Sequence, residues 1–521
     1  MLRQRGIAEM GVFCEESMIA KGKDSSAFGV ITRHGDCHQF KTFRARFFFL
    51  LCHHCAMKRN TDHLIGRGSL AQRFELGRLA RQDSPRSALG LHTSGGRDGL
   101  ALLAASNEGR IAELLPTRFG RMLASPFAFY RGAATLMAHD LAQTPRCGVT
   151  VQLCGDAHLS NFGLFASPER RLLFGLNDFD ETVPGPFDWD VRRLAASFVI
   201  AGREQGFKKS AIEGIVQTLL DTYHRRMLDF ADMDTLDVWY HQMTSETLLK
   251  LGGASKLEKA AIEKARSKGS RELVNNAVEW VDGPAGEEMR IKDVPPWVYH
   301  EAGATAREIG KFELGIQTFF EQYRSSLSLD RQVLFDRYEL MDVAVKVPGI
   351  GSVGTRCFVA LFAADGHHPL FLQFKQARNS ALMAPLGLKA HAHNGQRIVD
   401  GQRLCQATSD IFLGWASSKE LGAEFYVRQL RDMKGTLDVT LFSAADMSDY
   451  AQACGYALAR SQAKAGDPAL IAGYIGKSHA FDEAIARHAF AYADQNEADY
   501  VALKKAVKSG VAEAVEDAGD E

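Results

Sequence analysis

The chain has 521 residues, of which 46% are hydrophobic and 24% are charged. This composition is close to that of globular proteins and excludes a wholly disordered or fibrous chain. The 62 Lys and Arg residues nearly balance the 63 Asp and Glu residues, giving a net charge of −1. Such a balance attracts neither nucleic acid nor anionic membranes in general, so an anionic ligand needs a local site. The length predicts roughly three domains or two large lobes.

Cysteine content and hydropathy both indicate a reducing, aqueous compartment. The nine cysteines show no disulfide framework. The longest apolar run near the N-terminus, 47–52, is far shorter than the roughly 20 residues that span a bilayer. We therefore expect a soluble cytoplasmic protein whose partners include neither membrane nor nucleic acid; the oligomeric state is open. Residues 1–68 are expected to be a poorly ordered extension, although Cys-His-His-Cys at 52–55 offers zinc-type ligands.

Helical periodicity dominates residues 69–335, the first predicted lobe. Ser125 and Pro126 are expected to begin a helix that continues to about residue 141, because serine caps helices and proline suits the first turn. The elements predicted after it are strands at 149–153 and 171–176, a turn at 184–186, a helix at 190–202 and a mostly helical stretch at 208–330.

A strand-like pattern replaces the helical one after residue 342, so residues 336–440 are predicted to form a second, β-rich lobe. The expected elements are strands at 343–347, 355–362, 369–374 and 424–430, with a helix at 394–408. Residues 441–521 are predicted to be C-terminal helices with an acidic tail.

The densest polar cluster follows the first predicted strand and contains Asp156, His158 and Asn161. Asp178 and Asp180 follow the second strand. Turns are rich in Asp and Asn in any protein. Two such loops at adjacent strand ends nevertheless predict a divalent-cation site, because carboxylate and amide oxygens suit Mg²⁺.

The order of these residues resembles the catalytic loop of kinases. There an Asp accepts the proton of the acceptor hydroxyl, an Asn five residues later binds metal, and a second Asp lies on the next hairpin. Gly-Asp-x-His-x-x-Asn at 155–161 is most similar to the loop of aminoglycoside and choline phosphotransferases. The resemblance implies that Asp156 and His158 are catalytic and that Asn161 binds metal, with Asp178 or Asp180 as the second ligand.

Two further positions bear on this resemblance. Asp190 lies in a segment similar to the helix behind the catalytic loop of those phosphotransferases, so the resemblance implies a structural supporting role. Cys154 stands where that family usually has a His that supports the loop by hydrogen bonds. This departure leaves the geometry of the general base open.

A glycine-rich run at Gly349, Gly351 and Gly354 lies between two predicted strands. In a dinucleotide-binding fold it would open a helix; between strands it resembles the phosphate-covering loop of kinases. Lys375 ends a later strand, as the kinase phosphate-binding lysine does, and Asp400 on the next helix is the acid expected to pair with it. An ordinary hairpin turn and a surface lysine are the alternatives.

These elements follow the catalytic-type loop instead of preceding it. The resemblance therefore implies an α+β, protein-kinase-like two-lobed fold with circularly permuted lobes, which nearby termini make physically tolerable. The large lobe would be helix-rich, and the small antiparallel sheet lobe would hold the nucleotide. The strand at 426–430, including Arg428, would be an edge or hinge strand near adenine.

Much of the chain after residue 70 also resembles an uncharacterised bacterial family, domain of unknown function 2252. The motifs that carry this resemblance are Ser-Pro-Phe-Ala-Phe-Tyr-Arg-Gly at 125–132, Asn-Asp-Phe-Asp-Glu at 177–181, Asp-Gly-Gln-Arg at 400–403 and Tyr-Val-Arg-Gln-Leu-Arg-Asp-Met-Lys at 426–434. The family implies no activity, so the mechanism depends on the kinase-type motifs.

The motifs together predict an ATP- and Mg²⁺-dependent phosphotransferase with an unknown hydroxyl acceptor. A metal-dependent phosphoesterase and a non-catalytic nucleotide-binding protein on the same fold are the alternatives. Arg131, Arg403, Arg428 and Lys434 are candidate phosphate or acceptor contacts, because Arg forms forked bonds to anions, or members of structural ion pairs.

Overall fold

The computed structural model divides into two compact units, Met1–Asn60 and Thr61–Glu521, and the fold described here belongs to the second. The residues that the structure describes are 66, 68–251, 256–267, 277–283, 286–295, 297–300, 310–347, 349–365, 367–430, 433–435 and 437–515. The zinc-type residues at 52–55 and nearly all of the expected extension lie outside them. Within the described part, no helix is long and apolar enough to cross a membrane.

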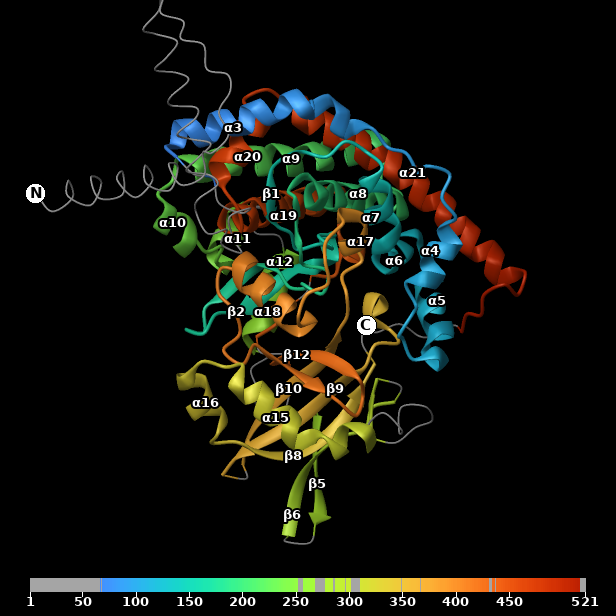
Figure 1. Ribbon diagram of the computed structural model, residues 1–521, viewed down its shortest axis with the longest axis vertical. Coiled ribbons are helices and arrows are strands. Elements are labelled where there is room, and N and C mark those ends of the chain that lie inside the picture. Colours follow the sequence, from blue (N-terminus) through green and yellow to red (C-terminus); the bar gives the residue numbers. More distant parts are fainter. Residues whose placement is uncertain are drawn as a thin grey trace, which may run out of the picture. The chain divides into compact units, whose positions relative to one another are not determined.

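A helical region occupies the upper half of the unit in Figure 1 and consists of elements from both ends of the chain. Its helices are α3 (Leu70–Asp83), η1 (Arg86–Gly90), α4 (Gly99–Ala105), η2 (Ala112–Leu114), α5 (Leu115–Leu123), α6 (Pro126–Gly132), α7 (Ala134–Ala142), α8 (Asp188–Glu204), α9 (Lys209–Asp232), α10 (Thr235–Tyr240), α11 (Ser245–Leu251), α12 (Lys256–Ser267), α19 (Ala444–Lys464), α20 (Pro468–Ile475) and α21 (Ala480–Lys508).

One hydrophobic core joins most of these helices, while α4 and α5 pack into a smaller cluster with residues of α6, α7 and α21. The larger core runs from Leu89 through the buried helix α8 to Ala493 on α21, and α19 packs along α9 while α20 packs on α3. The C-terminal helices thus belong to the same core as the first half of the chain. Ser125 caps α6 by accepting the Ala128 N–H (3.0 Å), as expected, but the predicted helix ends at Gly132 and α7 continues in its place.

A six-stranded antiparallel sheet forms the lower half of Figure 1, in the order β11-β12-β10-β9-β8-β7. Its strands are β7 (Val298–Tyr299), β8 (Glu339–Lys346), β9 (Cys357–Ala364), β10 (His368–Ala377), β11 (Gly414–Ser418) and β12 (Ala423–Gln429). The elements around it are the hairpin β5 (Val278–Gly283) and β6 (Gly286–Ile291) and the helices α15 (Ile316–Ser325), α16 (Leu329–Phe335) and α18 (Asn394–Cys405), with the short turn η4 (Ile350–Ser352) between β8 and β9. Helix α17 (Met383–Leu386) and the turn η5 (Val439–Leu441) pack on the helical region.

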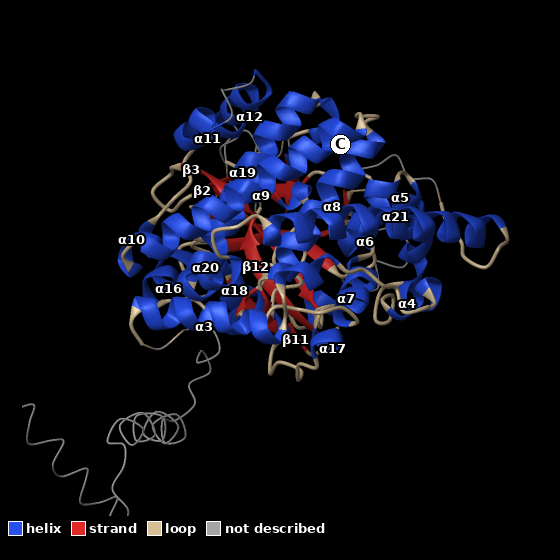
Figure 2. Ribbon diagram, turned by 90° about the horizontal axis from the view of Figure 1, so that it is seen from above, coloured by secondary structure: helices blue, strands red, loops and turns tan. Residues whose placement is uncertain are grey.

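The two faces of this sheet have different cores. One face carries an aromatic cluster in which Phe312 stacks on Phe358 at 4.7 Å and α15 adds Phe319. The opposite face carries smaller side chains that pack against Met289 and Ile291 of β6. Large rings and branched residues fit the pleated surface of a sheet, which explains why this stretch folds as strands. Seen from above, helices surround the strands (Figure 2).

The structure refines one sequence prediction and corrects two. The mostly helical stretch 208–330 also contains the hairpin β5–β6, because its alternating residues suit a pleated ladder. The strands β1 (Thr150–Gln152) and β3 (Leu172–Leu176) do not pair with each other: β1 pairs with β4 (Pro184–Pro186), and β3 pairs with β2 (Phe162–Ala166). Finally, β12 lies between β10 and β11, so it is an inner strand of the sheet and not its edge.

Candidate functional site

The loop after β1 is held in place by hydrogen bonds to its backbone N–H groups and by the conformation of a glycine. Gly155 has φ +91°, and a side chain there would collide with the Glu181 carbonyl, so only glycine fits. The buried Asp190 carboxylate, in the first turn of α8, accepts the N–H groups of Cys154 (2.8 Å) and Gly155 (3.0 Å). Carboxylates suit the N-terminal end of a helix. The predicted supporting role of Asp190 is thus confirmed.

Asp156 projects from this loop and is bound by a buried cation. The Arg193 Nε donates to its Oδ1 at 2.7 Å, and Arg193 also stacks its guanidinium on the Tyr130 ring at 3.9 Å. Burial raises the pKa of Asp156, and the charge of Arg193 opposes that rise. Asn161 donates its side-chain N–H to the Asp156 carbonyl (2.7 Å), so the two predicted residues are joined directly.

His158 lies behind this loop. Its side chain is buried against the edge of Phe127, and its Nε2 is 3.6 Å from Asp156 Oδ2. Burial, together with nearby arginine charges, lowers its pKa well below the ordinary value, so the ring is neutral near pH 7. This distance is too long for a hydrogen bond, and His158 does not line the cavity described below.

Lys375 of β10 meets the loop after β3. Its ammonium contacts the Asp180 carboxylate and lies 3.8 Å from Asp178 Oδ2. Although burial opposes its charge, the two carboxylates hold the pKa of Lys375 well above its usual value. Burial likewise opposes the charge of Asp180, but Lys375 outweighs it and lowers the carboxyl pKa. The Asp178 side chain is 37% exposed, so it remains open to a ligand.

The expected pairing of Lys375 with Asp400 is corrected by these contacts. Asp400 is exposed on α18, where Arg403 is among the charges acting on it. The residue of α18 that serves the site is Arg397, whose guanidinium donates to the carbonyls of Thr182 (2.6 Å) and Asp180 (2.9 Å). Helix α18 therefore braces the backbone of the aspartate loop instead of neutralising the lysine.

The glycine-rich run joins β8 to β9 and is tied to the helical region. Arg110 donates to the carbonyls of Gly351 (3.0 Å) and Val353 (2.5 Å), and the Ile111 N–H donates to that of Gly354 (2.7 Å). Gly354 has φ +85°, a conformation that favours glycine. A Cβ on Gly349 would meet nothing within 4 Å, so that position imposes no steric need for glycine.

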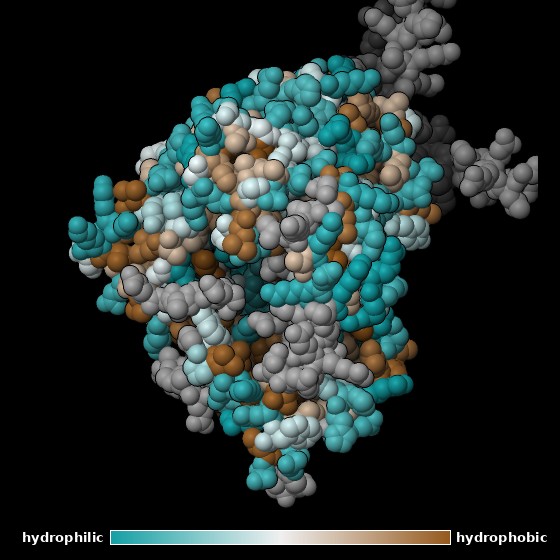
Figure 3. All heavy atoms as spheres, turned by 180° about the vertical axis from the view of Figure 1, so that it is seen from behind, coloured by the Kyte–Doolittle hydropathy of each residue, from teal (hydrophilic) through white to brown (hydrophobic). Residues whose placement is uncertain are grey.

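One cavity of about 240 Å³ collects most of these groups. Asp156, Asp178, Asp180 and Glu181 line it, with Gly351 and Ser352 of the glycine turn and the side chains of Arg110, Arg118, Arg131 and Arg378. Ser352 Oγ also donates to Asp180 Oδ2 at 3.3 Å. The lining does not include Lys375, His158, Asn161, Gly349, Gly354, Asp400 or Arg428. Seen from behind, hydrophilic side chains border a recess between the helical region and the sheet (Figure 3).

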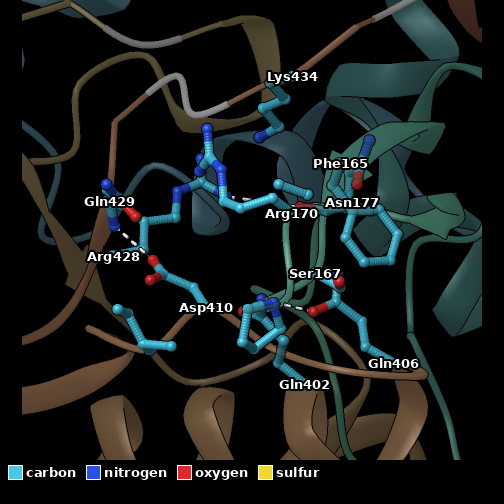
Figure 4. A pocket seen from close by; sticks show the side chains of 13 residues that line it. Phe165, Ser167, Arg170, Asn177, Gln402, Gln406, Asp410, Arg428, Gln429 and Lys434 are labelled. Atoms are coloured by element: carbon cyan, nitrogen blue, oxygen red, sulfur yellow. Dashed lines mark hydrogen bonds between the residues drawn. The ribbon is translucent and has the colours of Figure 1, made fainter. Parts of the chain in front are cut away.

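Arg428 and Lys434 line a second, adjacent cavity of about 170 Å³ (Figure 4). Arg428 donates to Gln373 Oε1 (3.0 Å) and to the Asn177 carbonyl (3.4 Å). The charge of Arg428, followed by burial, lowers the pKa of Lys434 to about 7. Arg403 instead donates to the Leu413 carbonyl (2.8 Å), which is a structural contact.

Several residues of the candidate site were not predicted from the sequence. Arg110, Arg118 and Arg378 come from separate segments with no motif around them, so only the fold brings them together. Arg193 carried a usable signal, because it lies three residues after Asp190 on α8 and therefore on the same helix face.

Comparison with known families agrees with the resemblance to domain of unknown function 2252. Residues 110–506 match the family described as an uncharacterized protein conserved in bacteria, DUF2252. The chain belongs to this family. The match covers all the residues that line both cavities except Ala105 and Ser106. Searches of curated proteins and of solved structures find no match.

Proposed function

We propose that this member of the DUF2252 family is an ATP- and Mg²⁺-dependent phosphotransferase acting on a hydroxyl group. The observation that carries the proposal is the meeting of Lys375, from the sheet, with Asp178 and Asp180. Both aspartates line the same cavity as Asp156, and Lys375 contacts them from outside its lining. These residues lie almost 200 positions apart in the chain. A placement of Lys375 far from the aspartates would have contradicted a kinase-like site.

The donor set fits Mg²⁺ and a triphosphate. Asp178 is open to the cavity and offers the carboxylate oxygens that Mg²⁺ prefers. Asn161, in the neighbouring loop and outside the lining, would become a second oxygen ligand only after its side chain turned toward the cavity. Bound Mg²⁺ would neutralise phosphate charge. Lys375 would hold the phosphates, Ser352 and the glycine turn would cover them, and Asp156 would orient or deprotonate the acceptor hydroxyl.

The connectivity of the sheet supports a permuted kinase-like arrangement. A glycine turn joins β8 and β9, the lysine is on the next strand β10, and helix α18 precedes the last two strands β11 and β12. These elements occur in the same relative order in the small lobe of kinases. In this chain they follow the catalytic-type loop, which is the permutation that we propose.

Cys154 stands where aminoglycoside and choline phosphotransferases usually have a histidine, but the loop is not left unsupported. The Cys154 thiol donates to the Asp178 carbonyl at 3.3 Å. Burial raises the pKa of this thiol well above its usual value, so it remains a neutral donor near pH 7. It therefore links the two halves of the proposed site, as a supporting side chain must.

Ligand binding tests the proposal directly. We expect ATP with Mg²⁺ to raise the melting temperature of the full chain by a few degrees, because a ligand that binds only the folded state stabilises it. Asp178→Ala should abolish this shift and reduce ATP turnover at least about 1,000-fold. The control Asp494→Ala removes a carboxylate that is 72% exposed and should change neither.

The outcomes separate the alternatives. The absence of any shift with ATP and Mg²⁺ in the native protein would contradict nucleotide binding. Binding without turnover under any acceptor screen would favour the non-catalytic alternative.

A further inference from the structure

Four arginines form one side of the first cavity, and we call Arg110, Arg118, Arg131 and Arg378 the arginine wall. They come from three places: the segment from α4 to α5, helix α6, and the loop after β10. Their convergence from separate segments brings four positive charges to one 240 Å³ space. A solvated helix face does not explain such a cluster.

The hydrogen-bond partners of three of these arginines are uncharged groups. Arg110 bonds to carbonyls of the glycine turn, and Arg118 bonds to Asn107 Oδ1 (2.9 Å) and the Gly132 carbonyl (2.8 Å). Arg378 donates to the carbonyls of Ser106 and Glu108. None of the four has a carboxylate within 4.0 Å among the residues that the structure describes.

Arg131 is the member that points to a ligand. Its buried Nε has no hydrogen-bond partner in the described part of the chain, and neither does Arg118 Nε. Burial lowers the pKa of all four guanidinium groups, and the neighbouring arginines lower that of Arg110 further. Buried unpaired charges are costly, so an anion that entered the cavity would relieve this cost.

The carboxylates of the same cavity act on the wall only at a distance. Asp156 and Asp178 oppose the fall in the pKa of Arg131, and Glu181 opposes that of Arg110 and Arg378. Asp156 is already paired with Arg193, and Asp180 with Lys375. The arginine wall therefore lacks a directly bonded counter-charge, while Lys375 and Asp178 form the side proposed for the nucleotide. Arg forms forked bonds to phosphate and carboxylate groups, which suits it to bind such a group on the acceptor.

We propose that the arginine wall is the acceptor subsite and that the acceptor is a small molecule carrying a phosphate or carboxylate group besides its hydroxyl. This inference rests on the proposed phosphotransferase function. Asp156 and the four arginines line the same cavity, so one small molecule can contact both. The anionic group would bind to the wall and leave the hydroxyl near Asp156.

Inorganic phosphate is the probe that tests the subsite. We expect calorimetric titration of the full chain, at chloride-matched ionic strength, to show phosphate binding that Arg131→Met weakens at least tenfold. Arg378→Met, a second variant, should weaken it as well. The control Arg225→Met removes an exposed arginine of α9 and should leave it within twofold. Equal phosphate binding by native protein and Arg131→Met, or no binding at all, would overturn the proposal.

A second titration, in saturating ADP with Mg²⁺, distinguishes the acceptor from the nucleotide. Phosphate and ADP should bind together, and Arg131→Met should leave the ADP affinity within twofold. Competition between them would assign the wall to the nucleotide and overturn the subsite. If ADP and ATP do not bind while phosphate binds through Arg131, the phosphotransferase proposal and the acceptor role both fall, whereas failure of phosphate alone leaves the phosphotransferase proposal standing.

Discussion

The two sides of the proposed site bury charge in opposite ways. On one side, Lys375 and Asp180 neutralise each other, and Ser352 adds a hydrogen bond. On the other, the arginine wall has backbone carbonyls and one amide oxygen as its partners. A paired charge can be stable without any ligand, whereas an unpaired one lowers stability until an anion arrives. This difference is the reason for proposing that the arginine wall binds the negative group of a ligand.

The largest expected effect on stability comes from removing one partner of the Lys375–Asp180 ion pair. Lys375→Met leaves Asp180 partly buried without its cation, so we expect the free energy of unfolding to fall by about 2 kcal/mol, less than for a fully buried pair because Asp180 is 25% exposed. Urea denaturation measures the change. Adding Asp180→Asn should recover most of it. Lys209→Met, which removes a lysine that is 79% exposed, should cost less than about 0.5 kcal/mol.

The opposite sign is expected for the arginine wall. Arg131→Met removes a guanidinium without a carboxylate partner, so the ligand-free protein should keep its stability or gain up to about 1 kcal/mol. The same urea denaturation, with Arg225→Met as the matched control, measures it. A loss above about 1 kcal/mol would show that Arg131 is a structural residue and would remove the contrast between the two sides.

The smallest expected effect concerns a paired charge outside the cavity. His224 of α9 lies 2.9 Å from Asp482 of α21 and also bonds to the Gly476 carbonyl (2.7 Å). Burial disfavours its charge, but Asp482 outweighs burial and raises the pKa of His224. His479 and Asp221 are the other titratable groups nearby.

Because the folded-state pKa is the higher one, the stabilising effect of this pair is complete below the unfolded value of about 6.5 and disappears as the pH rises through the folded value. We expect the free energy of unfolding to decline over this window in the native protein. His224→Gln should flatten that part of the profile, and an unchanged profile would contradict the ion pair.

The sequence was informative where chemistry and local order coincide. The loop at Asp156 and Asn161, the support from Asp190 and the position of Lys375 on a strand were all predictable, because each depends on nearby residues or on a strand-turn-strand pattern. The helix-rich and sheet-rich halves could be predicted for the same reason, since period 3.6 and period 2 are local signals.

The remaining features depend on tertiary packing. Asp400 was the acid expected to pair with Lys375, because it lies on the next helix. The face of that helix that packs against the site carries Arg397, however, and Asp400 lies on the exposed face. The pairing of β1 with β4 was not visible, because three-residue strands carry almost no periodicity. Arg110 and Arg378 are 268 positions apart in the printed sequence, and no local pattern could predict that they share a cavity.

The bonds between Arg110 and the glycine turn have a consequence for binding. They fix this turn, which belongs to the sheet, to the helical region even without a ligand. A ligand that contacts the turn would therefore meet a segment that is already ordered, so little conformational entropy would be lost there on binding.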